Sequence, residues 1–125
     1  NALQGAAIVG GEITEGRVYE ITSSARPDEI NDLIEIVLQG DFDVAEQCLQ
    51  ELLITRGIAP NELINQCYRS LIRRQMDRGL KAEMISQLGE TDFRLSEGAG
   101  SEIQMEAMLA RWVLSAQVSR ESRVR

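Results

Sequence analysis

A helix that is apolar on nearly every side constrains this chain most. Ser101 and Gln104 have the spacing of a capping box, which predicts that a helix begins there. Nine apolar residues then leave almost no polar face: Ile103, Met105, Ala107, Met108, Leu109, Ala110, Trp112, Val113 and Leu114. Such a helix has to be covered on several sides, by other helices of the domain, by another chain or by both. Glu106 and Arg111 interrupt it too much for a membrane span.

The remaining pattern predicts a small all-helical domain. With 125 residues, of which 43% are hydrophobic, the chain can bury one modest core. It has only two prolines and lacks the alternating β-branched runs that are typical of strands. We therefore expect an all-α bundle of about five helices from Pro27 onward, joined by short connections.

Apolar periodicity and end signals place the first four of these helices. One is predicted from Pro27 to Gly40, and a second from its cap at Asp41 to Gly57. The third begins near Pro60, and the fourth extends from about Leu80 as far as Glu97. The apolar stripes expected to face the core are Ile30, Leu33, Ile34, Val37 and Leu38; Ala45, Cys48, Leu49, Leu52 and Leu53; Leu63, Ile64, Cys67, Tyr68, Leu71 and Ile72; and Met84, Ile85, Leu88 and Leu95.

The first part of the chain is predicted to be separate from this bundle. A short apolar helix is expected over residues 1–9, and a second over about 15–21, with Thr14 as its N-cap. Polar residues 22–26 are predicted to form a linker. The chain starts at Asn1, within an expected helix, which predicts that it is a fragment of a longer protein.

The charge is acidic overall and unevenly distributed. The formal net charge is −7, and residues 1–60 carry 11 acidic and 3 basic side chains, whereas residues 61–125 carry 9 and 10. An acidic chain argues against a general nucleic-acid binder, whose surface should be basic. The asymmetry would allow copies to stack head to tail, and the alternative is a solvated acidic surface that favours solubility.

Catalytic and metal chemistry have little support in this sequence. The chain has no histidine, so the usual general base at neutral pH is missing. Cys48 and Cys67 are too few for a zinc site and are expected to be buried, reduced thiols on two different helices. No phosphate-binding loop or cofactor motif is present, so we do not interpret this segment as an enzyme.

A row of arginines is the main polar candidate site. Arg69 and Arg73, and likewise Arg74 and Arg78, are four residues apart and form two adjacent basic lines on one helix. They could contact an acidic face of a neighbouring chain or a phosphate backbone. The alternative is pairing within the chain, with Asp77, Glu62 or the acidic first half.

Two stretches resemble a known family. The run 89–99 (GETDFRLSEGA), followed by 102–107 (EIQMEA), is similar to the C-terminal signature of replication factor C small subunits. Residues 1–4 (NALQ) and the pairs at 13–14, 18–19 and 25–27 resemble the end of the lid domain in the same family. The similarity spans nearly the whole chain, in one order, and the archaeal form is the closer match.

This resemblance implies an architecture and a function. Residues 1–25 would be the end of the AAA+ lid domain, residues 26–118 the helical C-terminal collar domain, and residues 119–125 a tail. In this family of DNA-replication clamp loaders, the collar joins small subunits and the large subunit into a ring, which loads the sliding clamp onto primed DNA. ATP, magnesium, the clamp and DNA would be bound upstream, so no cofactor is implied for this segment. The location implied is cytoplasmic in archaea or nuclear in eukaryotes, without a membrane.

We therefore expect an oligomerisation module that has no catalysis of its own. The residues expected at the subunit interface are Arg69, Arg73, Arg74, Met105, Met108, Leu109 and Trp112, with Asp32 and Glu35 as acidic partners. The alternative is a helical nucleic-acid-binding domain that uses the arginines from Arg69 to Arg78 and the basic tail. A third hypothesis is a monomeric scaffold that docks peptide helices in a groove.

Overall fold

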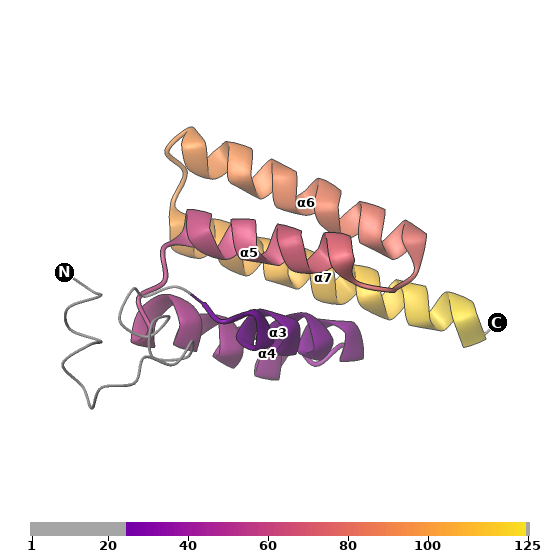
Figure 1. Ribbon diagram of the computed structural model, residues 1–125. Coiled ribbons are helices and arrows are strands. Elements are labelled where there is room, and N and C mark those ends of the chain that lie inside the picture. Colours follow the sequence, from indigo (N-terminus) through magenta and orange to yellow (C-terminus); the bar gives the residue numbers. More distant parts are fainter. Residues whose placement is uncertain (1–24, 125) are drawn as a thin grey trace, which may run out of the picture.

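The computed structural model describes residues 25–124, and these residues form a bundle of five α-helices. The helices are α3 (Pro27–Gln39), α4 (Phe42–Gln50), α5 (Pro60–Arg73), α6 (Arg78–Ser96) and α7 (Ser101–Val124), as Figure 1 shows. Within the described range there is no strand, and the predicted all-α bundle is confirmed. The helices predicted over residues 1–9 and 15–21, and the lid segment to which they were assigned, lie outside the described residues.

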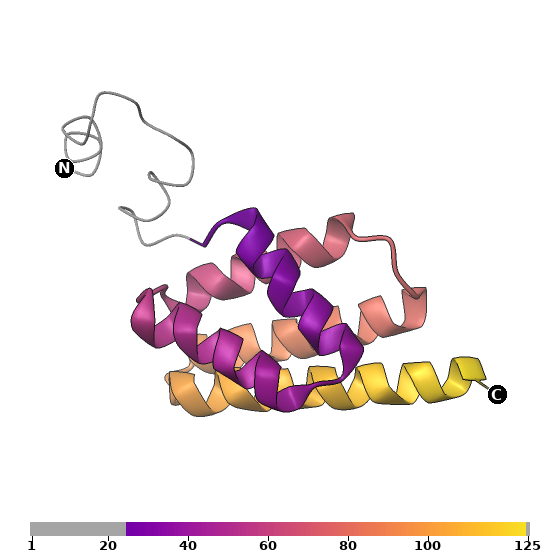
Figure 2. The ribbon, with the colours of Figure 1, turned by 90° about the horizontal axis from the view of Figure 1, so that it is seen from below.

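The bundle places α5 and α7 on opposite sides. Helix α3 packs against α4, α5 and α7, while α6 packs against both α5 and α7. Helices α6 and α7 run antiparallel (Figure 1). Figure 2 shows α5 along one edge of the bundle and α7 along the opposite edge, with α3 crossing between them. Each of the two edge helices therefore has one face in the core and one face turned outward.

The predicted helix ends are set by side-chain caps and one glycine. Asp41 accepts a hydrogen bond from the backbone N–H of Val44 at 3.2 Å, and Asp77 accepts one from the N–H of Leu80 at 2.9 Å. Each carboxylate satisfies a donor that the first helical turn leaves free. Gly40 ends α3 with a φ of 82°, a left-handed conformation that favours glycine.

The last turns of α7 cap the end of α3. Arg120 donates from Nη1 to the carbonyl oxygen of Leu38 at 2.9 Å, and Gln117 donates from Nε2 to the carbonyl oxygen of Gly40 at 3.3 Å. A cation at a helix C-terminus also complements the helix dipole. The segment expected to be a tail from residue 119 therefore continues α7 and contacts the bundle.

The core is built around Trp112. Its side chain is fully buried, and its indole N–H donates to the carbonyl oxygen of Met84 on α6 at 3.1 Å. The predicted stripes supply most of the other core residues, among them Ile30, Leu33, Ile34, Val37, Ala45, Leu49, Leu63, Ile64, Cys67 and Leu71. The predicted core position is wrong for two members of the α5 stripe, since Tyr68 and Ile72 are 46% and 51% exposed. The stripe is wider than the face that the neighbouring helices cover.

The helix predicted over residues 41–57 changes geometry near its end. Helix α4 passes into a π-helical turn, η1 (Glu51–Thr55), in which the N–H of Arg56 donates to the carbonyl oxygen of Glu51 at 2.9 Å. Leu52 in this turn is buried, as its place in the predicted stripe indicates, and Ile54 is 68% exposed. A regular helical period could not predict the π-helical turn.

The two cysteines are free thiols on two different helices, and the burial expected for both holds for Cys67 only. Cys67 on α5 is buried, and this burial raises the pKa of its thiol to about 12. Cys48 on α4 is half-buried, and partial burial also raises its thiol pKa. Both thiols are therefore protonated and poorly nucleophilic at neutral pH.

Candidate subunit interface

The apolar residues predicted at the interface lie in the core instead. Met105, Met108, Leu109 and Trp112 are at most 2% exposed, because they form the face of α7 that packs against α3, α4 and α6. A neighbouring chain cannot contact them unless the bundle opens. These four assignments are therefore corrected: the side chains stabilise the fold and do not form an exposed contact surface.

The opposite face of α7 is apolar and uncovered. At 100° per residue, Ile103, Leu114 and Val118 lie on the side of the helix away from Trp112, and they are 73%, 60% and 63% exposed. Ala107 and Ala110 fall on the same line between them. We call these five residues the outer face of α7. The sequence indicated that other helices or another chain must cover this helix on several sides. In the bundle, α3, α4 and α6 cover only the face that contains Trp112.

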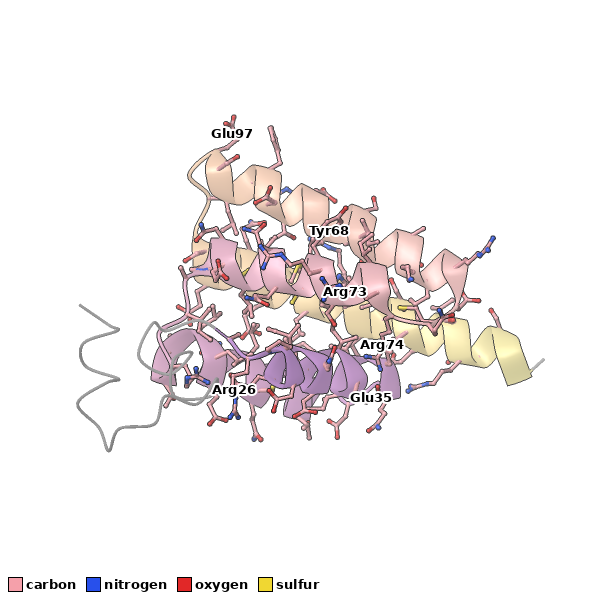
Figure 3. All side chains as sticks on the ribbon, viewed as in Figure 1. Arg26, Glu35, Tyr68, Arg73, Arg74 and Glu97 are labelled. Atoms are coloured by element: carbon pink, nitrogen blue, oxygen red, sulfur yellow. The ribbon has the colours of Figure 1, made fainter. Side chains whose placement is uncertain are left out.

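The arginine row divides into paired and unpaired members. Arg74 forms an ion pair with Glu35 on α3, and Figure 3 shows the two side chains together. Arg74 and Glu35 were both expected to face another subunit. They pair with each other within the chain, as the alternative for the arginine row allowed, and their interface role stays a prediction. Arg69 and Arg73 are exposed, and within residues 25–122 neither forms an ion pair or a hydrogen bond. Asp32 is also exposed on α3, where its predicted interface role stays a prediction.

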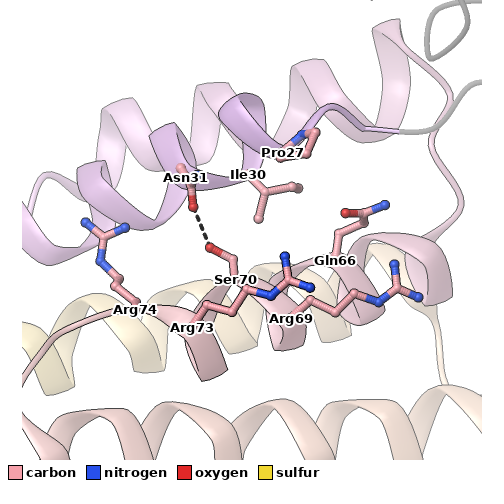
Figure 4. Close-up of a pocket in the computed structure, with 8 residues that line it drawn as sticks. All are labelled: Pro27, Ile30, Asn31, Gln66, Arg69, Ser70, Arg73 and Arg74. Atoms are coloured by element: carbon pink, nitrogen blue, oxygen red, sulfur yellow. Dashed lines mark hydrogen bonds between the residues drawn. The ribbon is translucent and has the colours of Figure 1, made fainter. Parts of the chain in front are cut away.

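A groove between α3 and α5 collects the arginines. It has a volume of about 590 Å³ and is lined by Pro27, Ile30, Asn31, Gln66, Arg69, Ser70, Arg73 and Arg74. In Figure 4 the hydroxyl of Ser70 donates to Asn31 at 2.6 Å across the groove, and Arg69 and Arg73 extend along its α5 wall. Three arginines and no acidic residue line this basic groove.

An apolar ridge stands beside the basic groove. Tyr68 and Ile72 are one turn apart on α5, both about half exposed, and next in sequence to Arg69 and Arg73. Both residues belong to the apolar stripe that was expected to face the core. The available signal was their position at the edge of the stripe, about 80° and 120° from its centre near Cys67 and Leu71.

A second groove, between α4 and α7, has the opposite charge. Its volume is also about 590 Å³, and it is lined by Phe42, Glu46, Gln50, Glu102, Ile103, Glu106, Ala107 and Ala110. Gln50 donates from Nε2 to Glu106 at 2.6 Å. Three glutamates and no basic residue line this acidic groove, and its apolar floor is part of the outer face of α7.

Glu46 in this groove holds its proton more tightly than an isolated glutamate does. A hydrogen bond with Glu106, followed by the negative charge of that residue, raises the pKa of Glu46 above its ordinary value. The folded state therefore binds this proton more tightly than the unfolded state does. It follows that the free energy of unfolding falls as pH rises from the ordinary glutamate pKa through the raised one.

We expect Glu46→Gln to stabilise the fold at pH 7, because it removes the like-charge contact with Glu106. Below the ordinary glutamate pKa the carboxyl of Glu46 is protonated and carries no charge, so the advantage should disappear. Urea unfolding at pH 7 and pH 3.5 would measure the difference. Glu83→Gln, which removes an exposed charge on α6, is the control and should show no such pH dependence; an advantage of Glu46→Gln that is equal at both values would contradict the coupling.

Comparison with known proteins identifies the domain that carries these grooves. Residues 25–111 match the family model described as the replication factor C C-terminal domain. The chain belongs to the replication factor C family. It is 62% identical over 120 residues to a replication factor C small subunit of Methanoculleus marisnigri, covering 96% of this chain and 37% of that protein. It is 65% identical over 115 residues to the small subunit of Methanoregula boonei, covering 92% and 36%, and 41% identical over 110 residues to that of Archaeoglobus fulgidus, covering 88% and 34%.

The predicted membership of the replication factor C family is thus confirmed, with archaeal relatives. The chain spans about a third of the length of these relatives. The stretch 89–99 that carried the resemblance forms the end of α6 and the turn toward α7, where buried Thr91 donates to the carbonyl oxygen of Gln87 at 3.0 Å.

Two further findings describe residues 25–124. No helix in this range is long and apolar enough to cross a bilayer. Nor are three or more His, Cys, Asp or Glu side chains grouped there in a way that could hold a metal ion.

Proposed function

We propose that this domain joins subunits of a replication factor C clamp loader and catalyses no reaction itself. Family membership supports the assignment, and the relatives' name, small subunit, describes one part of an assembly with subunits of different size. The other small subunits and the large subunit would be the partners. The sliding clamp, primed DNA, ATP and magnesium would bind the parts of the protein that correspond to the rest of the relatives' length.

The outer face of α7 is the observation that carries this proposal. Three large apolar side chains are at least 60% exposed, in one line, on a helix whose other face forms the core. Scattered exposed apolar residues are ordinary, whereas a continuous line of them marks a contact surface. Burying this line against another subunit would give α7 the cover on several sides that its sequence requires.

Nucleic-acid binding by the arginines is the less favoured function. Arg74 is neutralised by Glu35, which leaves two free arginines in the groove of a chain whose net charge is −7. Phosphate contacts by a few arginines on an acidic domain would give weak binding.

We expect the chain to self-associate, which light scattering on a sizing column across a range of protein concentrations would detect. Leu114→Glu places a charge in the middle of the outer face of α7 and should shift the mass toward the monomer. Ile54→Glu is the matched control, because Ile54 is as exposed but lies on η1, outside this face. A wild-type chain that stays monomeric at every concentration would overturn the proposal, and so would equal masses for the two variants.

A further inference from the structure

The linings of the two grooves of this domain carry opposite charges. Both have a volume of about 590 Å³, one is lined by three arginines without an acid, and the other by three glutamates without a base. They lie on different sides of the bundle, since one follows α5 and the other follows α7 (Figure 2). Because they are on different sides, one copy cannot bring its own grooves together, but two copies can.

We propose that the α5 side of one copy, with its ridge and basic groove, docks into the acidic groove of a second copy. The inference rests on the proposed function, since it names the two faces through which subunits would meet. The contact is heterologous: each copy uses one face toward the preceding neighbour and a different face toward the next. Such contacts produce rings or open stacks, in which every copy has two neighbours.

The charges that would meet are free to do so. Arg69 and Arg73 have no partner within residues 25–122, whereas Arg74 is held by Glu35 and is not needed. The opposing groove offers Glu46, Glu102 and Glu106. Glu46 lies beside Glu106 in the single copy, where a hydrogen bond with Glu106 and then the negative charge of that residue raise the pKa of Glu46. Two arginines brought between these carboxylates would offset their negative charge.

The apolar parts of the two faces also correspond. Tyr68 and Ile72 project from α5 beside the arginines. The acidic groove is lined by the apolar residues Phe42 and Ile103 and by the small residues Ala107 and Ala110. Tyrosine and arginine are residue types enriched at the centres of protein interfaces, and the α5 side carries Tyr68 next to Arg69.

Reversed charges on both faces provide the test. In one variant Arg69→Glu and Arg73→Glu make the basic side acidic; in another Glu102→Lys and Glu106→Lys make the acidic groove basic. Each variant then presents two faces of the same sign, so its self-association should weaken at least tenfold. In an equimolar mixture the two variants can alternate, so that each contact joins one acidic and one basic face. The mixture should therefore associate as the wild type does. Sedimentation velocity of each variant and of the mixture would measure this.

The controls separate this inference from the proposed function. Arg78→Glu and Glu97→Lys each reverse one charge, of the same sign as in the corresponding double variant, at exposed sites outside both grooves, and both should associate normally. Circular dichroism would verify that each variant keeps its helices. Variants that still associate like the wild type would overturn the assignment of faces while leaving the proposed function intact. Variants that dissociate but are not rescued in the mixture would also overturn it, because direct complementarity requires rescue.

Discussion

Trp112→Ala should lower the free energy of unfolding by about 3–5 kcal/mol, the range measured for truncating large buried aromatic residues. The indole is fully buried at the centre of the bundle, so its loss leaves a cavity lined by α6 and α7. It also leaves the carbonyl oxygen of Met84 without its side-chain donor. A domain of this size has a total stability of about 5–15 kcal/mol, so the variant should be marginally folded at 37 °C.

Two further variants separate packing from hydrogen bonding in this prediction. Trp112→Phe keeps much of the ring and removes the N–H donor, so it should cost less than Trp112→Ala. Phe93→Ala removes an aromatic side chain that is 63% exposed on α6, and should change stability by less than about 1 kcal/mol. Guanidinium unfolding followed by circular dichroism would compare all three. A loss of less than about 1 kcal/mol in the free energy of unfolding for Trp112→Ala would contradict the claim that the core is built around the indole.

Gly40→Ala should be the second most damaging of the changes considered. Its φ of 82° costs an alanine about 1–2 kcal/mol by itself. A Cβ at this position also overlaps the guanidinium of Arg120, which caps α3. Gly57→Ala is the matched control, because Gly57 has a φ of 67° with nothing within 4 Å of an added Cβ. Urea unfolding should show the larger loss for Gly40→Ala.

A double-mutant cycle tests whether the overlap with Arg120 causes the larger loss of stability in Gly40→Ala. In an Arg120→Ala background the overlap is gone, so Gly40→Ala should cost no more than Gly57→Ala does. If the excess persists without the guanidinium, the steric explanation is wrong.

The sequence predicted the helices and most of their ends, because the signals there are local; the exception is α7, which continues beyond the tail boundary expected at residue 119. Asp41, Gly40 and Pro60 act within one turn of their own position, and the apolar period follows from the helix itself. The π-helical turn η1 was missed because its sequence differs little from that of a regular helix.

The exposed surfaces of the helices were predicted less well, because they depend on which neighbouring helices pack against each face. Trp112 and Leu114 are both apolar residues of one helix, and only the positions of α3, α4 and α6 make the first a core residue and the second an exposed one. In the same way, Arg73 and Arg74 are adjacent in sequence, but only Arg74 reaches Glu35 on the neighbouring helix. Periodicity gives the apolar faces of a helix; tertiary packing selects which of them stays exposed.

The hydrogen bond from Arg120 to Leu38 also has a consequence for biosynthesis. It joins residues 82 positions apart, and the ribosome makes the α3 end long before the α7 end. Until the final turns of α7 leave the exit tunnel, α3 has only its local cap at Gly40 and lacks the side-chain caps from α7, and α7 cannot yet cover the core residues of α3 and α4. Completion of the bundle is thus postponed to the end of this segment's synthesis, and the nascent helices stay exposed to chaperones until then.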